Sequence, residues 1–327
     1  MTPGHLVLLV LKASLFLMVF AVGLRARASD MAFLLHHPSL LIRSIVSMHV
    51  VMPLLVLWSA LGFELHPAVK VGLIALALSP VPPMLPSRAS VVHGQASYTV
   101  GLLTTTAVLS IFFVPLALWT LGTLMHTHLF LPPHVVSLLV GISILLPLAS
   151  GVVIGHFAPK IANRAAKPLS IIGTVLLVLA AVPLVVDAWP WMRVLIGNGT
   201  LVAIILLTLL GLGVGHLFGG PDPDTRSVLG IATATRHPAV AITIAAAAAP
   251  SHVLTPSALV LAPSAVLLAL IVGALASVPY LMWTKRQALR RSRLSVTSQQ
   301  RRRSADVSTH QGTPAGFHAH GPGEHRS

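Results

Sequence analysis

An arginine, a histidine and a proline follow one another at positions 236–238, in the middle of an apolar stretch. Residues 228–250 read VLGIATATRHPAVAITIAAAAAP, which is long enough to cross a bilayer. A guanidinium at the centre of a membrane helix costs about 3 kcal/mol on insertion scales unless a partner offsets it. Pro238 lacks an N–H and disfavours helix at the preceding residue, so we expect the helix to break there. A charge at such a break indicates a transport site.

A second interrupted segment lies in the first half of the chain. Residues 76–92 read LALSPVPPMLPSRASVV and combine prolines, hydroxyl residues and one arginine, Arg88. The two segments are expected to cross the membrane in opposite directions. A pair of interrupted segments in corresponding halves is the best sequence indication of the midplane site of a secondary transporter.

Side chains near the two breaks are suited to binding an anion. An arginine binds carboxylate, phosphate or sulfonate groups through two hydrogen bonds, and the half-helix after Pro238 presents N–H groups that favour an anion. We expect a small organic anion as substrate, and the candidate substrate-binding residues are Arg88, Arg236, His237, Ser87, Thr233, Thr235 and Thr99. The alternative is that each arginine neutralises carbonyls of the opposite broken helix and contacts no substrate.

Histidine chemistry is the other possibility at this site. His237 could titrate near physiological pH and couple protons to transport, or it could be bonded to backbone carbonyls at the break. The chain has no cysteine and no HExxH motif, so we predict no catalytic residues, no metal site and no cofactor beyond Na⁺ or H⁺ as a coupling ion. Glycines at 211, 213 and 215 lie inside an apolar run, which favours close helix packing over a nucleotide-binding loop.

The elements that must position these residues are membrane helices. The chain has 327 residues, of which 55% are hydrophobic and only 9% charged, whereas about a quarter of a soluble domain is charged. We therefore predict an all-α polytopic membrane protein. Apolar runs of about 20 residues predict nine spanning helices, at about 5–24, 39–62, 67–94, 97–120, 134–157, 168–188, 196–219, 226–250 and 256–283.

Basic residues predict the orientation of these helices. Most short loops with lysine or arginine fall on one side of the bilayer, together with the basic segment that follows the ninth span. The C-terminus is therefore predicted to be cytoplasmic, in a multi-pass protein of the plasma or inner membrane. Residues 1–284 are predicted to form the transporter domain and residues 285–327 a disordered basic tail that contacts anionic lipids. This tail accounts for much of the net charge of +14 without any nucleic-acid partner.

Three motifs resemble those of the bile acid:sodium symporter family. They are the helix end at residues 18–24, MVFAVGL, the tripeptide 52–54, MPL, and the broken helix around 79–83, SPVPP, which leads to Gly94. Arg236-His237 resembles the crossover pair of the second half. The resemblance covers about residues 5–283 and implies two inverted repeats, about 5–157 and 168–283. It also implies panel and core domains, with substrate and ions bound where the two broken helices cross.

The chain departs from that family at the positions that bind sodium. In sodium-coupled members a glutamate lies four residues before the crossover pair, and here that position is Ala232. Ser87-Arg88 resembles the pair of the first broken helix, and Thr99 resembles a sodium-ligating serine. Arginines thus occupy both crossovers, so sodium or proton coupling stays open. We predict a secondary active transporter that works by alternating access and is not an enzyme. The alternatives are an intramembrane metal-dependent enzyme and a non-transporting sensor or scaffold.

Overall fold

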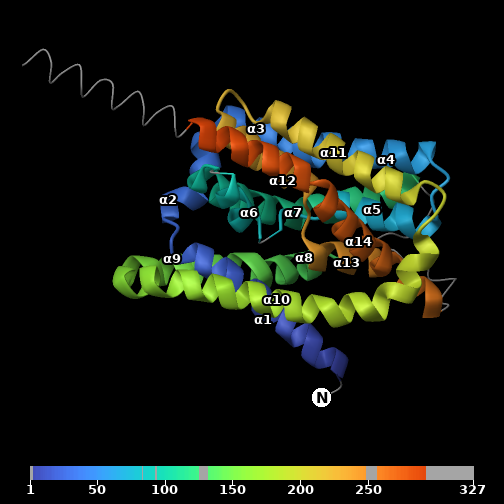
Figure 1. The fold of residues 1–327 in the computed structure, drawn as a ribbon, viewed down its shortest axis with the longest axis horizontal. Helices are drawn as coiled ribbons and strands as arrows, with labels where there is room; N and C mark the ends of the chain where they lie inside the picture. Colours follow the sequence, from blue (N-terminus) through green and yellow to red (C-terminus); the bar gives the residue numbers. More distant parts are fainter. Residues whose placement is uncertain (1–2, 83, 93, 125–131, 248–255, 292–327) are drawn as a thin grey trace, which may run out of the picture. The chain divides into compact units, whose positions relative to one another are not determined.

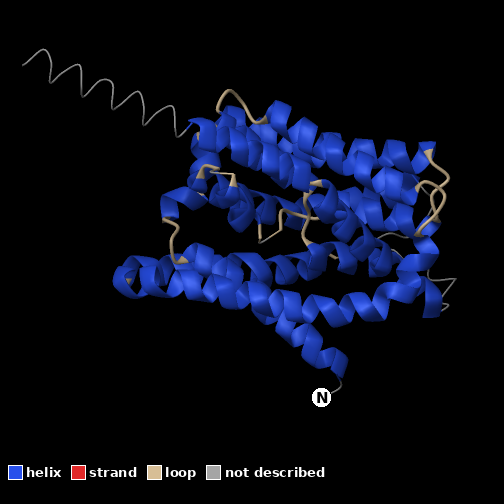
Figure 2. Cartoon of the chain, viewed as in Figure 1, coloured by secondary structure: helices blue, strands red, loops and turns tan. Residues whose placement is uncertain are grey.

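All the regular structure in the described residues is helical (Figure 2). The computed structural model describes residues 3–82, 84–92, 94–124, 132–247 and 256–291. The chain divides into two units, Met1–Met282 and Trp283–Ser327. Seven helices among the described residues are long and apolar enough to cross a membrane, and two shorter apolar helices, Leu9–Gly23 and Pro67–Leu78, accompany them. The predicted all-α polytopic membrane fold is confirmed.

The helices follow the predicted apolar runs closely. In chain order they are α1 (Pro3–Gly23), α2 (Ala28–Met31), η1 (Phe33–His36), α3 (Pro38–Ile45), η2 (Val46–Val51), α4 (Met52–Gly62), α5 (Pro67–Leu78), α6 (Leu85–Val91), α7 (Ala96–Leu124), α8 (Pro133–Val140), η3 (Gly141–Leu145), α9 (Leu146–Phe157), α10 (Pro159–Leu195), α11 (Thr200–Phe218), α12 (Pro223–Ala234), α13 (Pro238–Ala247) and α14 (Pro256–Ala276). The segments η2 and η3 are π-helical turns inside otherwise continuous spans.

Two boundaries differ from the prediction. The span expected at 168–188 is part of the longer helix α10, which continues through prolines at 168, 183 and 190 and through the basic residues near 160–167. Residues 285–291, predicted as part of a disordered tail, are helical, because alanine, leucine, lysine, glutamine and arginine are all good helix formers. Residues 292–327 lie outside the described part of the chain.

Proline starts many of these helices. In the part of the chain that the structure describes, it is the first residue of eight α-helices, among them α5, α12 and α13. At the first helical position the missing N–H costs nothing, and the fixed φ angle suits the helix. Both predicted breaks are present, the first with Pro86 at the second position of the following helix and the second with Pro238 at the first position. α5 ends at Leu78 and α6 begins at Leu85, whereas α12 ends at Ala234 and α13 begins at Pro238.

One group of helices packs through glycine. Helix α1 contacts α9 and α10, and Figure 1 shows the three together, with α11 and α12 forming a separate pair. A Cβ atom added to Gly151 of α9 would lie 2.5 Å from the carbonyl oxygen of Phe20 and 2.8 Å from the Cα of Gly23, both in α1. Backbones approach this closely only where small residues allow it.

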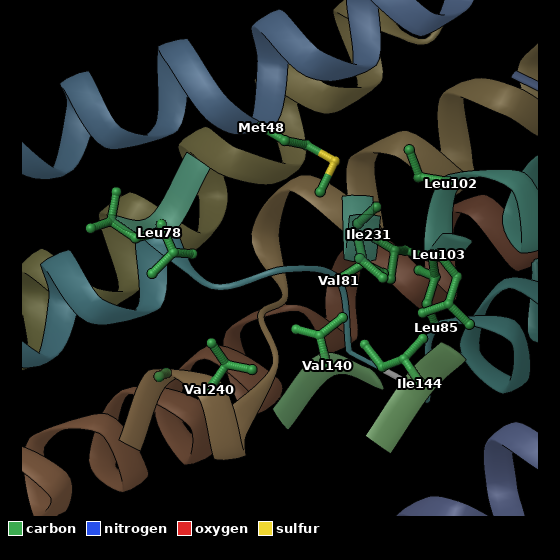
Figure 3. Close-up of a cluster of buried hydrophobic side chains, with 14 of the residues drawn as sticks. Met48, Leu78, Val81, Leu85, Leu102, Leu103, Val140, Ile144, Ile231 and Val240 are labelled. Carbon is green, nitrogen blue, oxygen red and sulfur yellow. The ribbon is translucent and has the colours of Figure 1, made fainter. Parts of the chain in front are cut away.

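The largest apolar core surrounds both breaks. Its buried side chains come from elements distant in sequence, among them Met48 of η2, Val81 between α5 and α6, Ile231 of α12 and Val240 of α13 (Figure 3). Val81 is fully buried although its backbone belongs to no helix. The core therefore fixes the irregular segment between α5 and α6 against α12 and α13.

Candidate functional site

The two breaks meet directly through a backbone hydrogen bond. The N–H of His237, between α12 and α13, donates to the carbonyl oxygen of Pro80, between α5 and α6, at 2.8 Å. The residue after His237 is a proline, as are residues 80 and 82, so this region is poor in N–H groups. The predicted crossing of the two broken helices is therefore present.

Arg236 lies at this crossing and is almost completely buried. Its side chain is 5% exposed. Nη1 donates to the carbonyl oxygen of Ala232, in the last turn of α12, at 3.3 Å, and Nη2 donates to that of Met48, in η2, at 3.0 Å. The Nε–H has no acceptor among the described residues. The guanidinium thus has two carbonyl partners and at least one unused donor.

The carbonyl of Met48 is available because of Pro53. In the π-helical turn the N–H of Met52 donates five residues back, to the carbonyl of Ser47. The next donor in that register would be residue 53, and its acceptor would be Met48. A proline has no N–H, so the Met48 carbonyl lacks its helical partner and accepts from Arg236 instead.

Two predicted threonines, one in the last turn of α12 and one directly after it, lie beside Arg236. Thr233 is fully buried, and its Oγ1 lies 2.8 Å from the hydroxyl oxygen of Ser47 in η2. Thr235 Oγ1 donates to the carbonyl of Ile231 at 2.6 Å. The Ser47–Thr233 bond and the Arg236–Met48 bond both join the end of α12 to η2.

A cavity of about 350 Å³ opens beside these residues. It brings together four predicted site residues: Arg88, Thr233, Thr235 and Arg236. The opposite wall is apolar and comes from α1 and α10, including Leu11, Leu15, Leu177 and Ala181. The two arginines are the only charged side chains that line this cavity in the described part of the chain. No hydrogen bond or ion pair is seen between the Arg88 guanidinium and another described residue.

Ser87 and Thr99 lie elsewhere. They line a second cavity of about 290 Å³, together with Arg25 and Asp30. The hydroxyl of Ser87 donates to the carbonyl of Met84 at 2.7 Å, and that of Thr99 donates to Gln95 at 2.8 Å. Consecutive residues of a helix are about 100° apart around its axis, so Ser87 and Arg88 face different sides of α6. The structure does not bring these two hydroxyls to the arginine cavity.

His237 is also absent from the lining of the arginine cavity. Its side chain is fully buried, and its Nδ1 accepts a hydrogen bond from the N–H of Val240 at 3.4 Å. This is the bond that an N-cap side chain makes to the first turn of a helix, here α13. An accepting Nδ1 places the proton of a neutral imidazole on Nε2, which has no partner among the described residues.

The residues that the sequence analysis missed are Ser47 and Met48. Neither carries charge, and Met48 contributes a backbone atom, so composition and spacing gave no reason to select them. The available signal was Pro53, which marks an unpaired carbonyl one turn earlier in the helix. Among the described residues, no group of three or more histidines and acids is placed to hold a metal ion. The histidines at positions 310, 318, 320 and 325 lie outside those residues.

Comparison with known families identifies the family of this chain. The family model described as "Sodium Bile acid symporter family" matches residues 13–189, which is more than half of the chain and includes the first break. The second break lies beyond the matched range. Comparison with curated proteins found no match. The multi-pass helical fold, the crossing breaks and the family match agree, and the chain belongs to the sodium bile acid symporter family of membrane transporters.

Proposed function

We propose that this protein is a secondary active transporter that moves a small organic anion across the cell membrane by alternating access. The observation that carries the proposal is the cavity at the crossing of the broken helices. Its only charged lining residues among those described are Arg88 and Arg236, and the rest of its wall is mostly apolar. A ligand with one anionic group and an apolar body matches that lining.

The arginines favour an anion because no acid offsets them. No salt bridge to either arginine is present in the described part of the chain, although a charge inside a membrane protein is normally paired. A buried donor without an acceptor costs about 1–3 kcal/mol, and Arg236 Nε–H is such a donor. A carboxylate, sulfonate or phosphate group in this cavity would supply the acceptor that the Arg236 Nε–H lacks.

The two walls of the cavity suggest how access could alternate. One part of the lining belongs to α1 and α10, and the other belongs to α4–α6 and α11–α14, including the segments at the two breaks. A movement of one group against the other would open the cavity first to one side of the membrane and then to the other. The proposal includes a cytoplasmic C-terminus, which the distribution of lysine and arginine among the short loops supports.

The test is uptake of a panel of organic anions into proteoliposomes by wild type, Arg88→Gln and Arg236→Ala. Arg193→Gln is the matched control, because Arg193 is exposed in the last turn of α10 and lines neither of the two cavities described above. We expect the two cavity variants to lose about tenfold or more of the uptake, because a charge-assisted bond contributes about 1.5–3 kcal/mol. Unchanged uptake by Arg88→Gln and Arg236→Ala, both correctly inserted, would refute the proposal.

A further inference from the structure

The crossing of the broken helices attracts a cation for a structural reason. The last carbonyls of a helix have no helical donor and carry partial negative charge, and α12 ends there. The Met48 carbonyl, released by Pro53, points to the same place. A positive group at this point satisfies carbonyls that would otherwise be buried without partners.

The cation found at this point is part of the chain. Arg236 reaches back along its own segment to Ala232 and across to Met48, so its guanidinium lies between the two carbonyls. Its fork of donors can serve two acceptors in different directions, which a single ammonium does less well. The Ser47–Thr233 hydroxyl pair holds the same two segments together at 2.8 Å.

The residues here do not fit a sodium ion in addition. A hard cation needs several oxygen ligands, commonly with a carboxylate among them. Position 232 is an alanine, and no acid lines the cavity in the described part of the chain. The carbonyls of Ala232 and Met48 already accept from Arg236, and the guanidinium would repel a second cation.

We propose that Arg236 is a tethered cation that occupies the place of a coupling cation, so that this protein transports its anion without binding sodium at the crossing. The inference rests on the proposed function and adds to it the absence of sodium dependence. Two N–H groups of Arg236 bind the carbonyls, and the remaining donors face the anion. A sodium-coupled transporter binds its positive charge from solution as a sodium ion, whereas here the positive charge is the Arg236 guanidinium, which is part of the chain.

The first experiment measures anion uptake into proteoliposomes in sodium chloride and in choline chloride, with no other change. We expect a ratio of initial rates close to one. A rate about tenfold or more higher in sodium chloride would overturn the tethered-cation proposal and leave the anion-transport proposal intact. An absence of uptake of every anion in both salts would instead count against the proposed function, and the second experiment then decides about the tethered cation.

The second experiment is a thermal melt of the purified protein, which does not depend on transport. Arg236→Ala leaves the two carbonyls without their donor, so methylguanidinium should bind there and raise the melting temperature by roughly 2–5 °C at about ten times its Kd. Arg88→Ala is the control, because the Arg88 guanidinium bonds to none of the described residues and its loss leaves no carbonyl unpaired. Wild type should not respond to methylguanidinium or to sodium.

Each outcome of this melt has a defined meaning. A selective rise for Arg236→Ala supports the proposal, and so does a selective rise of that variant in sodium chloride over choline chloride. Equal responses of all three proteins to methylguanidinium, or stabilisation of wild type by sodium, overturn it. If Arg236→Ala does not fold, Arg236→Gln takes its place. The melting temperature of wild type with and without sodium still tests the tethered-cation proposal, because a rise in sodium overturns it.

Discussion

The position of α12, and with it of Arg236, depends on a glycine in the neighbouring helix. Gly215 of α11 faces α12, where an added Cβ would overlap the carbonyl oxygen of Leu229 and would lie 2.6 Å from Thr233 Oγ1 and 2.7 Å from the Cα of Gly230. Two of these three atoms are backbone and cannot move away as a flexible side chain would. We predict that Gly215→Ala pushes α12 away from α11.

Gly213 provides a matched control for this change. It lies in the same helix, two residues earlier, and a Cβ atom there meets nothing within 4 Å. Replacement of glycine by alanine improves helix propensity by about 0.5–1 kcal/mol at either position, so that gain cancels in the comparison. Overpacking costs typically about 1–3 kcal/mol, and only Gly215→Ala suffers it.

The assay is the melting temperature of the two variants in detergent, followed by anion uptake. At about 2–4 °C per kcal/mol, Gly215→Ala should melt roughly 2–12 °C below Gly213→Ala. It should also transport more slowly, because Thr233 and Arg236 move with α12. Equal melting temperatures and equal uptake for the two variants would refute the close α11–α12 approach on which the geometry of the site depends.

Three further predictions test other contacts. Pro53→Ala supplies an N–H that can donate to the Met48 carbonyl. This N–H would compete with the Arg236 guanidinium for that carbonyl, so anion uptake should fall several-fold. Pro147→Ala, which makes the same change after the π-turn η3, should leave uptake unchanged, and similar losses in both would contradict this explanation. His237→Asn keeps a capping acceptor and should retain uptake, whereas His237→Leu should lose about 1 kcal/mol of stability in a melt; loss of uptake in both would favour proton transfer through this residue. Gly151→Val should destabilise the protein far more than Gly141→Val, where a Cβ meets nothing within 4 Å, and equal melting temperatures would argue against the α1–α9 contact.

Much of the fold could be predicted from local physical chemistry. Apolar runs of bilayer length located the spans, because an unpaired backbone is too costly in lipid for anything but a helix there. Prolines located both breaks for an equally local reason, the missing N–H. The packing role predicted for the glycines of α11 holds for Gly211 and Gly215, which both approach α12, but not for Gly213, where a Cβ would meet nothing within 4 Å.

The composition of the site was only partly predictable. Arg88, Thr233, Thr235 and Arg236 do line one cavity, but Ser87 and Thr99 line another, and His237 caps α13. Adjacent residues in sequence were expected to share a site, yet a helix turns about 100° per residue and separates them. That separation depends on where each helix face points within the packed structure.

The sequence by itself determined the helices, their interruptions and the presence of two arginines near those interruptions, because these depend on burial in lipid and on the hydrogen-bonding capacity of single residues. Only the tertiary structure decided what the arginines contact. The Met48 carbonyl that accepts from Arg236 lies 188 residues away in sequence. Pro53 leaves that carbonyl free, but the packing of α12 against η2 selects the donor that reaches it.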